Sequence, residues 1–147
     1  MSKYRVIQLT NNNIGAVAID DFLPLGGITR RIQGKEDCCN TFHVTTSGAD
    51  TVVINECGNY NITYNASVVA AAAGILSLSL VMNGVTLYTA SVTAAAGSTV
   101  NITIPYQIRV RPNCASYEVN VPANIQVQLS GVAVTGGASN IIVERVY

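Results

Sequence analysis

The chain has 147 residues, of which 49% are hydrophobic and only 11% are charged. This length suits one domain of ordinary size, and the apolar content is too high for a disordered chain. The 8 basic and 8 acidic residues cancel, so no net charge attracts nucleic acid or an anionic membrane, and we expect neither as a partner.

The N-terminal residues predict a protein that is made in the cytoplasm of its host. Residues 1–5 lack the long apolar stretch of a secretion signal. No run elsewhere approaches the ~20 apolar residues of a membrane span, because Asn, Ser and Thr interrupt the apolar sequence throughout. The final location need not be the cytoplasm, since virion and spore-coat proteins leave the cell by lysis.

Apolar and polar residues alternate along much of the chain with the period of two that half-buried strands show. In the N-terminal part this pattern predicts short strands at residues 4–9, 14–19, 41–46 and 51–54. Residues 60–68 alternate without a break, with apolar residues at the even positions and polar residues at the odd ones.

A hairpin is predicted in the middle of the chain. Residues 76–82 carry an apolar row that ends at Asn83-Gly84. This dipeptide is the strongest short hairpin signal, because both residues tolerate positive φ. The partner strand is therefore expected at residues 85–92.

Three further strands are predicted towards the C-terminus, at residues 100–110, 125–129 and 140–147. Pro105 cannot donate a ladder hydrogen bond, so the first of these strands lies at a sheet edge or carries a bulge. The alternation changes phase after Gly131.

The number and spacing of these strands predict the fold class. No helical crossover separates them, and the Ala-rich residues 68–74 are too short and lack the caps that a helix needs. We therefore expect a single all-β domain, an antiparallel β-sandwich or jelly roll.

The polar side of the predicted strands carries almost no charge, and no charged residue occurs between Glu56 and Arg109. Strands that face water usually carry Lys and Glu, whereas interface centres are depleted in charge. We hypothesise that this neutral face packs against copies of the chain; the alternative is a neutral exterior. Its outward positions are Asn61, Thr63, Asn65, Ser67, Ser77, Ser79, Thr89, Ser91, Asn101 and Thr103, and the tyrosines expected at the oligomer interface are Tyr60, Tyr64, Tyr88 and Tyr106.

Three short runs resemble a known family. Residues 54–64, INECGNYNITY, resemble the G-x-Y-x-(I/V)-x-Y strand of tumour-necrosis-factor-like and complement-type trimeric jelly rolls. The resemblance extends to the versions in bacterial collagen-like surface proteins, such as exosporium glycoproteins of spores, and in tailed-phage structural proteins. Residues 78–85, LSLVMNGV, look like the next hairpin of these domains, and residues 138–143, ASNIIV, look like their closing strand.

The resemblance covers residues 41–147 and implies a homotrimeric jelly-roll domain with its chain ends near one pole. The chain departs from the collagen-like members because it has no Gly-X-Y stalk. Residues 1–40 take the place of the stalk and resemble the leading segment of small phage virion proteins. We expect them to form a docking arm, with Arg5, Arg30, Arg31 and Lys35 as its basic residues, or else to supply the first strands of the sandwich.

Four cysteines, Cys38, Cys39, Cys57 and Cys114, could lie near one pole of the sandwich. Cys39 and Cys57 both precede strands that would run in the same direction, and Cys114 follows a strand that would run in the opposite direction. Paired disulfides would fit a particle that exists outside cells. Free thiols would fit folding in reducing cytoplasm. A zinc site is a third alternative, although the sequence lacks the C-x-x-C pair that such sites usually have. The sequence leaves these alternatives open.

No motif in the chain predicts catalysis. His43 is the single histidine, and neither a nucleophile elbow nor a zinc-protease helix accompanies it. The acidic residues Asp20, Asp21, Asp37, Asp50, Glu56 and Glu118 lie in predicted turns, with no spacing that pairs two of them for acid–base work. Three Asn-x-Ser/Thr sequons, at Asn61, Asn65 and Asn101, fall inside predicted strands and reflect strand alternation. We expect neither an enzyme nor a bound metal or cofactor.

The function that fits these features best is structural. We expect a component of a tailed-phage virion, such as a capsid decoration, a head fibre or an accessory trimer, whose partners are other virion proteins, above all the capsid. One alternative is a carbohydrate- or host-surface-binding module that attaches to a host glycan through Tyr and Asn at loop tips. Another is a structural protein of the spore surface.

Overall fold

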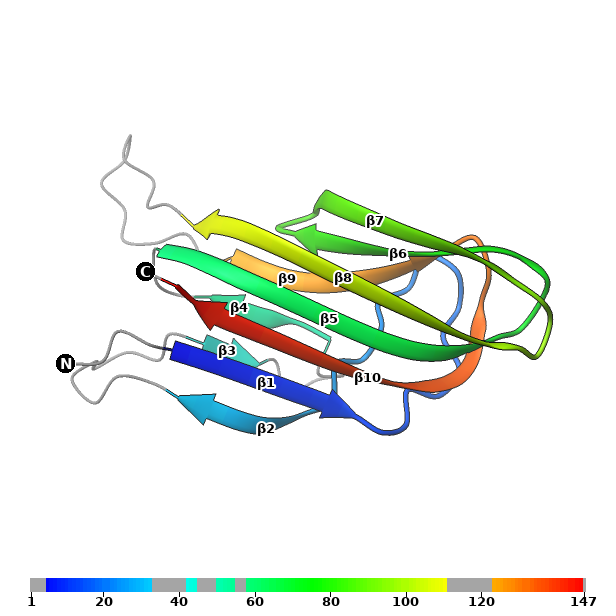
Figure 1. The fold of residues 1–147 in the computed structure, drawn as a ribbon, viewed down its shortest axis with the longest axis horizontal. Helices are drawn as coiled ribbons and strands as arrows, with labels where there is room; N and C mark the ends of the chain where they lie inside the picture. Colours follow the sequence, from blue (N-terminus) through cyan, green and yellow to red (C-terminus); the bar gives the residue numbers. More distant parts are fainter. Residues whose placement is uncertain (1–4, 33–41, 45–49, 55–57, 111–122, 147) are drawn as a thin grey trace.

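The computed structural model describes residues 5–32, 42–44, 50–54, 58–110 and 123–146, with the backbone alone for residues 42–44 (Figure 1). Within these ranges the chain forms ten strands and no helix. The strands are β1 (Arg5–Asn11), β2 (Gly27–Ile32), β3 (Phe42–Val44), β4 (Val52–Ile54), β5 (Gly58–Ala70), β6 (Gly74–Met82), β7 (Val85–Ala94), β8 (Thr99–Val110), β9 (Ala123–Ser130) and β10 (Val134–Arg145). This all-β arrangement confirms the predicted fold class.

The strands form two antiparallel sheets that face each other as a sandwich (Figure 1). The first sheet has the order β2-β1-β10-β5-β8, and the second has the order β3-β4-β9-β6-β7. From β4 onwards every connection crosses from one sheet to the other, except the β6–β7 hairpin. This alternation between two sheets is the jelly-roll topology.

Both ends of the described chain lie at the same end of the sandwich, which we call the termini end. β1 pairs with β10 so that Arg5 stands opposite Arg145 (Figure 1). At the opposite or far end, the backbone N–H of Ala71 donates to the carbonyl of Ala133 (2.9 Å), and that of Gly97 donates to the carbonyl of Ala70 (2.8 Å). The turns after β5, β7 and β9 are thereby joined.

The core lies between the two sheets and follows the predicted alternation. On β5 the even positions from Tyr60 to Ala70 are all buried. The facing residues of the second sheet, such as Leu78 and Val127, have no exposed surface. Each large apolar side chain that is fully buried in this way contributes about 1.5–3 kcal/mol to folding.

The predicted hairpin is present at Asn83-Gly84. Both residues have positive φ, 51° and 82°, and Met82 pairs with Val85 across the turn. The Asn83 backbone N–H donates to the carbonyl of Asn124 (3.0 Å), and the N–H of Asn124 donates to Asn83 Oδ1 (2.8 Å). The turn is therefore fixed to β9 as well as to its own strands.

The prediction of a strand at residues 14–19 is wrong. Gly15 and Asp20 have φ of 74° and 72°, so the backbone cannot remain extended there. The segment instead places Ile14 and Val17 in the core and forms a single bridge, from Val17 to Val134. The segment runs beside β10 and directs apolar side chains into the core, so its sequence looks like that of a strand.

β2 was not predicted, and β10 begins earlier than predicted. β2 is an edge strand, and its residues are exposed apart from the partly buried Ile32, so no apolar face marks it. β10 begins at Val134 and not at residue 140. Its first part contains Gly136 and Gly137 and a register shift against β5, which hide the alternation.

Candidate functional site

The outer face of the first sheet carries neutral polar side chains in rows that run across the strands. In one row, Thr10 on β1 stands opposite Asn140 on β10, Asn140 opposite Asn65 on β5, and Asn65 opposite Thr103 on β8. All four side chains are at least partly exposed. We call this surface the amide face.

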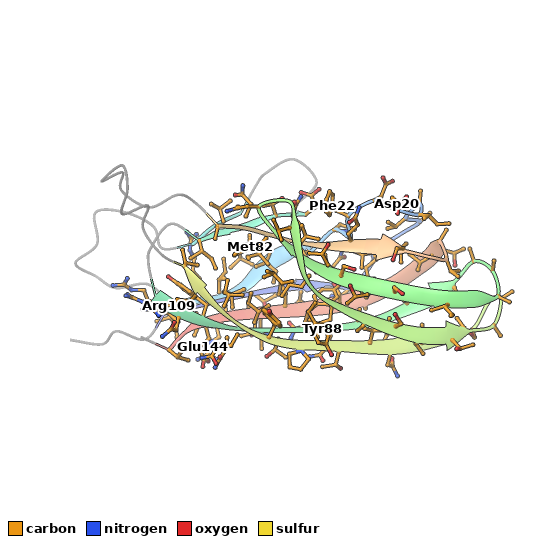
Figure 2. All side chains as sticks on the ribbon, turned by 90° about the horizontal axis from the view of Figure 1, so that it is seen from above. Asp20, Phe22, Met82, Tyr88, Arg109 and Glu144 are labelled. Atoms are coloured by element: carbon orange, nitrogen blue, oxygen red, sulfur yellow. The ribbon has the colours of Figure 1, made fainter. Side chains whose placement is uncertain are left out.

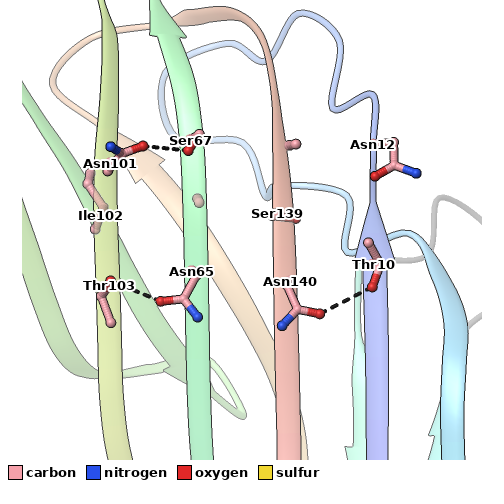
Figure 3. Close-up of a pocket in the computed structure, with 11 residues that line it drawn as sticks. Thr10, Asn12, Asn65, Ser67, Asn101, Ile102, Thr103, Ser139 and Asn140 are labelled. Carbon is pink, nitrogen blue, oxygen red and sulfur yellow. Dashed lines mark hydrogen bonds between the residues drawn. The ribbon is translucent and has the colours of Figure 1, made fainter.

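Hydrogen bonds hold the side chains of this row in place (Figure 3). Thr103 Oγ1 donates to Asn65 Oδ1 at 2.9 Å. Asn140 Oδ1 accepts from Thr10 Oγ1 at 3.2 Å and from Gln8 Nε2 at 2.9 Å. In the neighbouring row, Ser67 Oγ donates to the Oδ1 of Asn101. The orientations of these amides are therefore set by the sheet itself.

Towards the far end, the amide face has a shallow hollow of about 400 Å³, which we call the amide hollow (Figure 3). Gly137 on β10 makes the close approach of β10 to β5 possible. It has φ of 150°, and a Cβ there would lie 2.3 Å from the backbone oxygen of Ser67. The hollow is lined by Thr10, Asn12, Asn65, Ala66, Ser67, Asn101, Ile102, Thr103, Ala138, Ser139 and Asn140.

The sequon-like spacing explains how the sequence builds this face. On a strand, residues i and i+2 point to the same side. Each Asn-x-Ser/Thr triplet at Asn61, Asn65 or Asn101 thus places an amide and a hydroxyl side by side on the outer face, while the residue between them enters the core. The interpretation of these triplets as strand alternation agrees with the structure.

The second sheet has its own neutral outer face. Ser77 and Ser91 are joined by a hydrogen bond of 2.7 Å between their hydroxyls, and Ser79 and Thr89 by one of 2.9 Å. The single neutral face predicted from the sequence is therefore two faces on opposite sides of the sandwich. The reason is topological, because β5 and β8 lie in one sheet and β6 and β7 in the other.

Two of the four tyrosines expected at an interface lie in the core. Tyr60 and Tyr64 have no exposed surface, so the chain's own interior removes them from any contact with another copy. Burial raises the pKa of Tyr64 above its usual range, an effect that the nearby Ser139 hydroxyl partly opposes. The Tyr64 phenol therefore stays neutral.

The other two tyrosines form a pair where β7 and β8 meet at the edges of the two sheets; Tyr88 is labelled in Figure 2. The ring centroids of Tyr88 and Tyr106 are 5.9 Å apart, and the rings are inclined by 49°. Tyr88 is 40% exposed, and Val85 on the same strand is 62% exposed. The role of this pair in contacts between copies remains a prediction.

The basic residues expected in a docking arm differ in their surroundings. Arg5 belongs to β1 and is only 8% exposed, so it is not available on a free arm. Arg30 and Arg31 are exposed on the edge strand β2. Lys35 lies outside the described residues.

The remaining candidate residues are only partly covered by the structure. All four cysteines, and the acidic residues Asp37, Glu56 and Glu118, lie outside the described ranges, and only the backbone of His43 is described. Asp20 and Asp21 lie beside β9, where the N–H of Leu129 donates to the Asp21 carbonyl (2.9 Å). In the part of the chain that is described, no group of three or more His, Cys, Asp or Glu residues could hold a metal ion.

Among the same described residues, no helix is long and apolar enough to cross a membrane.

No protein-family model matches the chain, and no curated protein matches it at a significant level. Solved structures do match. The globular domain of the zebrafish complement 1qA protein shares 8% sequence identity with the chain, over 99% of this chain and 98% of that one, with a TM-score of 0.66. The tumour-necrosis-factor protein Eiger from S. frugiperda shares 9% identity over 98% and 93% of the two chains, also with a TM-score of 0.66.

A vertex protein is also among the similar structures. The PRD1 vertex protein P5 shares 14% identity with the chain, over 97% of each chain, with a TM-score of 0.60. At such low identities the likeness concerns the fold and not the activity. This protein therefore has the jelly-roll fold of tumour-necrosis-factor-like and C1q-like domains, which the resemblance of its short sequence runs implied.

Proposed function

We propose that this protein is a non-enzymatic structural component of a tailed-phage virion that assembles as a homotrimer. The similarity to the PRD1 vertex protein P5 supports a structural role in a phage particle at the level of the fold. The similarity to C1q-like and tumour-necrosis-factor-like domains is consistent with self-association. Within the particle, its role would be that of a capsid decoration, a head fibre or an accessory trimer.

The observation that carries the assembly step is the aromatic edge of the sandwich. Tyr88, Tyr106 and Val85 lie there on strands without a single charged residue from Gly58 to Ile108. Tyrosine is enriched and charge is depleted in the centres of protein interfaces. An edge with this composition is expected to be covered, and a second copy is the partner that the proposal assigns to it.

The termini end is the part that the proposal assigns to docking. The exposed Arg30 and Arg31 lie on β2, beside β1 in the first sheet. Arg109 and Glu144 also lie towards this end (Figure 2). Arg5 and Arg145 lie there too, whereas Asp20 and Asp21 lie farther along the sandwich, beside Leu129 of β9. The particle would thus meet the end with most of the charges that the structure describes, and the far end would project from it.

The oligomeric state tests the assembly step. Light scattering coupled to size exclusion is expected to give three times the chain mass of 15.4 kDa. Tyr88→Lys places a charge at the aromatic edge and is expected to yield monomers. The control is Ala72→Lys, which adds the same charge at an exposed position in the turn after β5 and should stay trimeric. A monomeric parent protein at micromolar concentration would contradict the proposal.

The location in a particle is tested by an inventory of purified virions. Mass spectrometry of virions from an infected host is expected to find the protein in a fixed ratio to the capsid protein. If it is found only in the soluble fraction of the lysate, the virion role is wrong.

A further inference from the structure

The hydrogen bonds of the amide face use the Oδ1 atoms of Asn65 and Asn140 and not their Nδ2 atoms. Asn65 Oδ1 accepts from Thr103, and Asn140 Oδ1 accepts from both Thr10 and Gln8. No described residue accepts from the Nδ2 groups of Asn65 and Asn140. The sheet therefore satisfies the acceptors and leaves the amino groups as donors.

These two amino groups face each other. Figure 3 shows the Nδ2 atoms of Asn65 and Asn140 turned towards one another over the space between β5 and β10. Because Asn65 and Asn140 are direct partners in the strand register, one acceptor atom placed above them can receive a hydrogen bond from each. A carbonyl oxygen has the two lone pairs that this arrangement requires.

The next row of the hollow adds an acceptor and a methyl group. Ser67 Oγ gives its hydrogen to Asn101 Oδ1, which leaves its lone pairs available to a donor. Ala138 is the direct partner of Ser67 in the register and is exposed. The hollow thus combines the facing N–H donors of Asn65 and Asn140 with the hydroxyl acceptor of Ser67 and the methyl group of Ala138. No charged residue is among those that line it.

We propose that the amide hollow binds the acetamido group of an N-acetylated sugar. The acetamido carbonyl would accept from Asn65 and Asn140, its N–H would donate to Ser67, and its methyl would contact Ala138. The volume of about 400 Å³ falls in the range of small-ligand sites. This inference goes beyond the proposed function and does not depend on it.

Other ligand classes fit the lining less well. An anion would lose its hydration without gaining a cation, because no Lys or Arg lines the hollow. A flat apolar ligand would find no aromatic side chain among the lining residues. A neutral group that combines carbonyl, N–H and methyl matches all three features.

The test uses two disaccharides and direct observation of the amides. The probe is N,N′-diacetylchitobiose, and cellobiose is the comparison because it has hydroxyls in place of the acetamido groups. The side-chain N–H signals of Asn65 and Asn140 in an NMR titration are expected to shift with the first sugar and not with the second. Millimolar affinity is expected, since the hollow is shallow and offers few contacts.

Variants separate the donors from the rest of the face. Asn65→Asp and Asn140→Asp keep the Oδ1 acceptors that bind Thr103, Thr10 and Gln8, but they replace the N–H donors by a second oxygen and add one negative charge. Each is expected to weaken binding by about tenfold. The matched control is Asn61→Asp, which adds the same charge to the same face and strand outside the hollow; its affinity should equal that of the parent.

Several outcomes would overturn the proposal. These are the absence of shifts at saturating probe, equal binding of cellobiose, or an equal loss in Asn61→Asp. Light scattering on the same samples tests whether a second copy of the chain covers the hollow. If Asn65→Asp or Asn140→Asp changes the oligomeric mass, a second copy covers the hollow and the sugar site is wrong. A monomer that binds the sugar would sustain this inference while contradicting the trimer.

Discussion

Tyr64 lies at the centre of the sandwich with its ring fully buried, and its hydroxyl lies near the buried hydroxyl of Ser139. Neither oxygen makes a well-formed hydrogen bond to a described residue. An unsatisfied buried polar group costs about 1–3 kcal/mol. The ring therefore contributes to stability by packing, while the oxygen contributes little or opposes folding.

Replacing the tyrosine should separate these two contributions. Tyr64→Phe removes only the hydroxyl, so we expect the free energy of unfolding to stay equal or to rise by about 1 kcal/mol. Tyr64→Ala also removes the ring and leaves a cavity, which should cost about 3–5 kcal/mol. Urea denaturation of the two variants measures both effects. A large loss in Tyr64→Phe would show that the hydroxyl has a partner that matters.

The same residue predicts a dependence on alkaline pH. Burial raises the pKa of Tyr64 in the folded state above its unfolded value of about 10. The folded state then holds its proton more tightly, so this contribution to stability is complete below that pH and is lost as the pH rises above it. Above pH ~10 the free energy of unfolding should decrease with pH less steeply for Tyr64→Phe than for the parent. Urea denaturation at several pH values measures both dependences, and identical slopes would contradict this assignment.

Among single residues, the sequence already contained the information that places Tyr60 and Tyr64. Both are in phase with Ile62, so the alternation that predicts the strand also directs them into the core. The interface prediction overlooked this phase because tyrosine is common at interfaces. Tyr88 and Tyr106 could not be paired in advance, since their contact depends on how the edges of two different sheets approach each other.

At the scale of elements, strands with one buried face were predictable and those without one were not. β5 and β8 show regular alternation and were placed within a few residues. β2 is exposed on both sides, so it gives no pattern. The sequence also cannot tell that the outward residues of β5 and β6 point to opposite sides of the molecule, because strand order is not visible in local alternation.

The first strands yield a prediction about residues 1–37. β1 lies between β2 and β10 in the first sheet, and Ile7 and Leu9 have no exposed surface. Deleting residues 1–37 would expose the edge of β10 and the core beneath it, so we expect a chain that aggregates or fails to fold. Far-ultraviolet circular dichroism and sizing of the truncated protein would show this. A folded trimer would instead indicate a segment that is separable from the sandwich.

Docking can be tested without removing that strand. The double variant Arg30→Gln, Arg31→Gln keeps β2 and changes only two exposed side chains. We expect it to fold and to form trimers like the parent, but to bind particles more weakly. The measurement is its recovery with particles that lack the protein, after sedimentation. Full recovery would exclude these arginines from the docking contact.

At the scale of the whole molecule, the two ends of the sandwich differ in charge and in what they can offer a partner. The termini end carries the start of β1 and the end of β10, together with Arg5 and Arg145. The far end consists of short turns rich in alanine and glycine, and Ala71, Ala72 and Ala73 are exposed there. If the charged end meets the particle, the far end must face the solvent.

A peptide tag inserted at either end would reveal this orientation. Between Ala72 and Ala73 it falls in an exposed turn after β5, so we expect an intact trimer on the particle, with the tag accessible to antibody on whole virions. The same tag added after Tyr147 extends the termini end and is expected to reduce incorporation into particles. If both tagged proteins are incorporated equally and only the C-terminal tag is accessible, the far end faces the particle and the termini end faces the solvent.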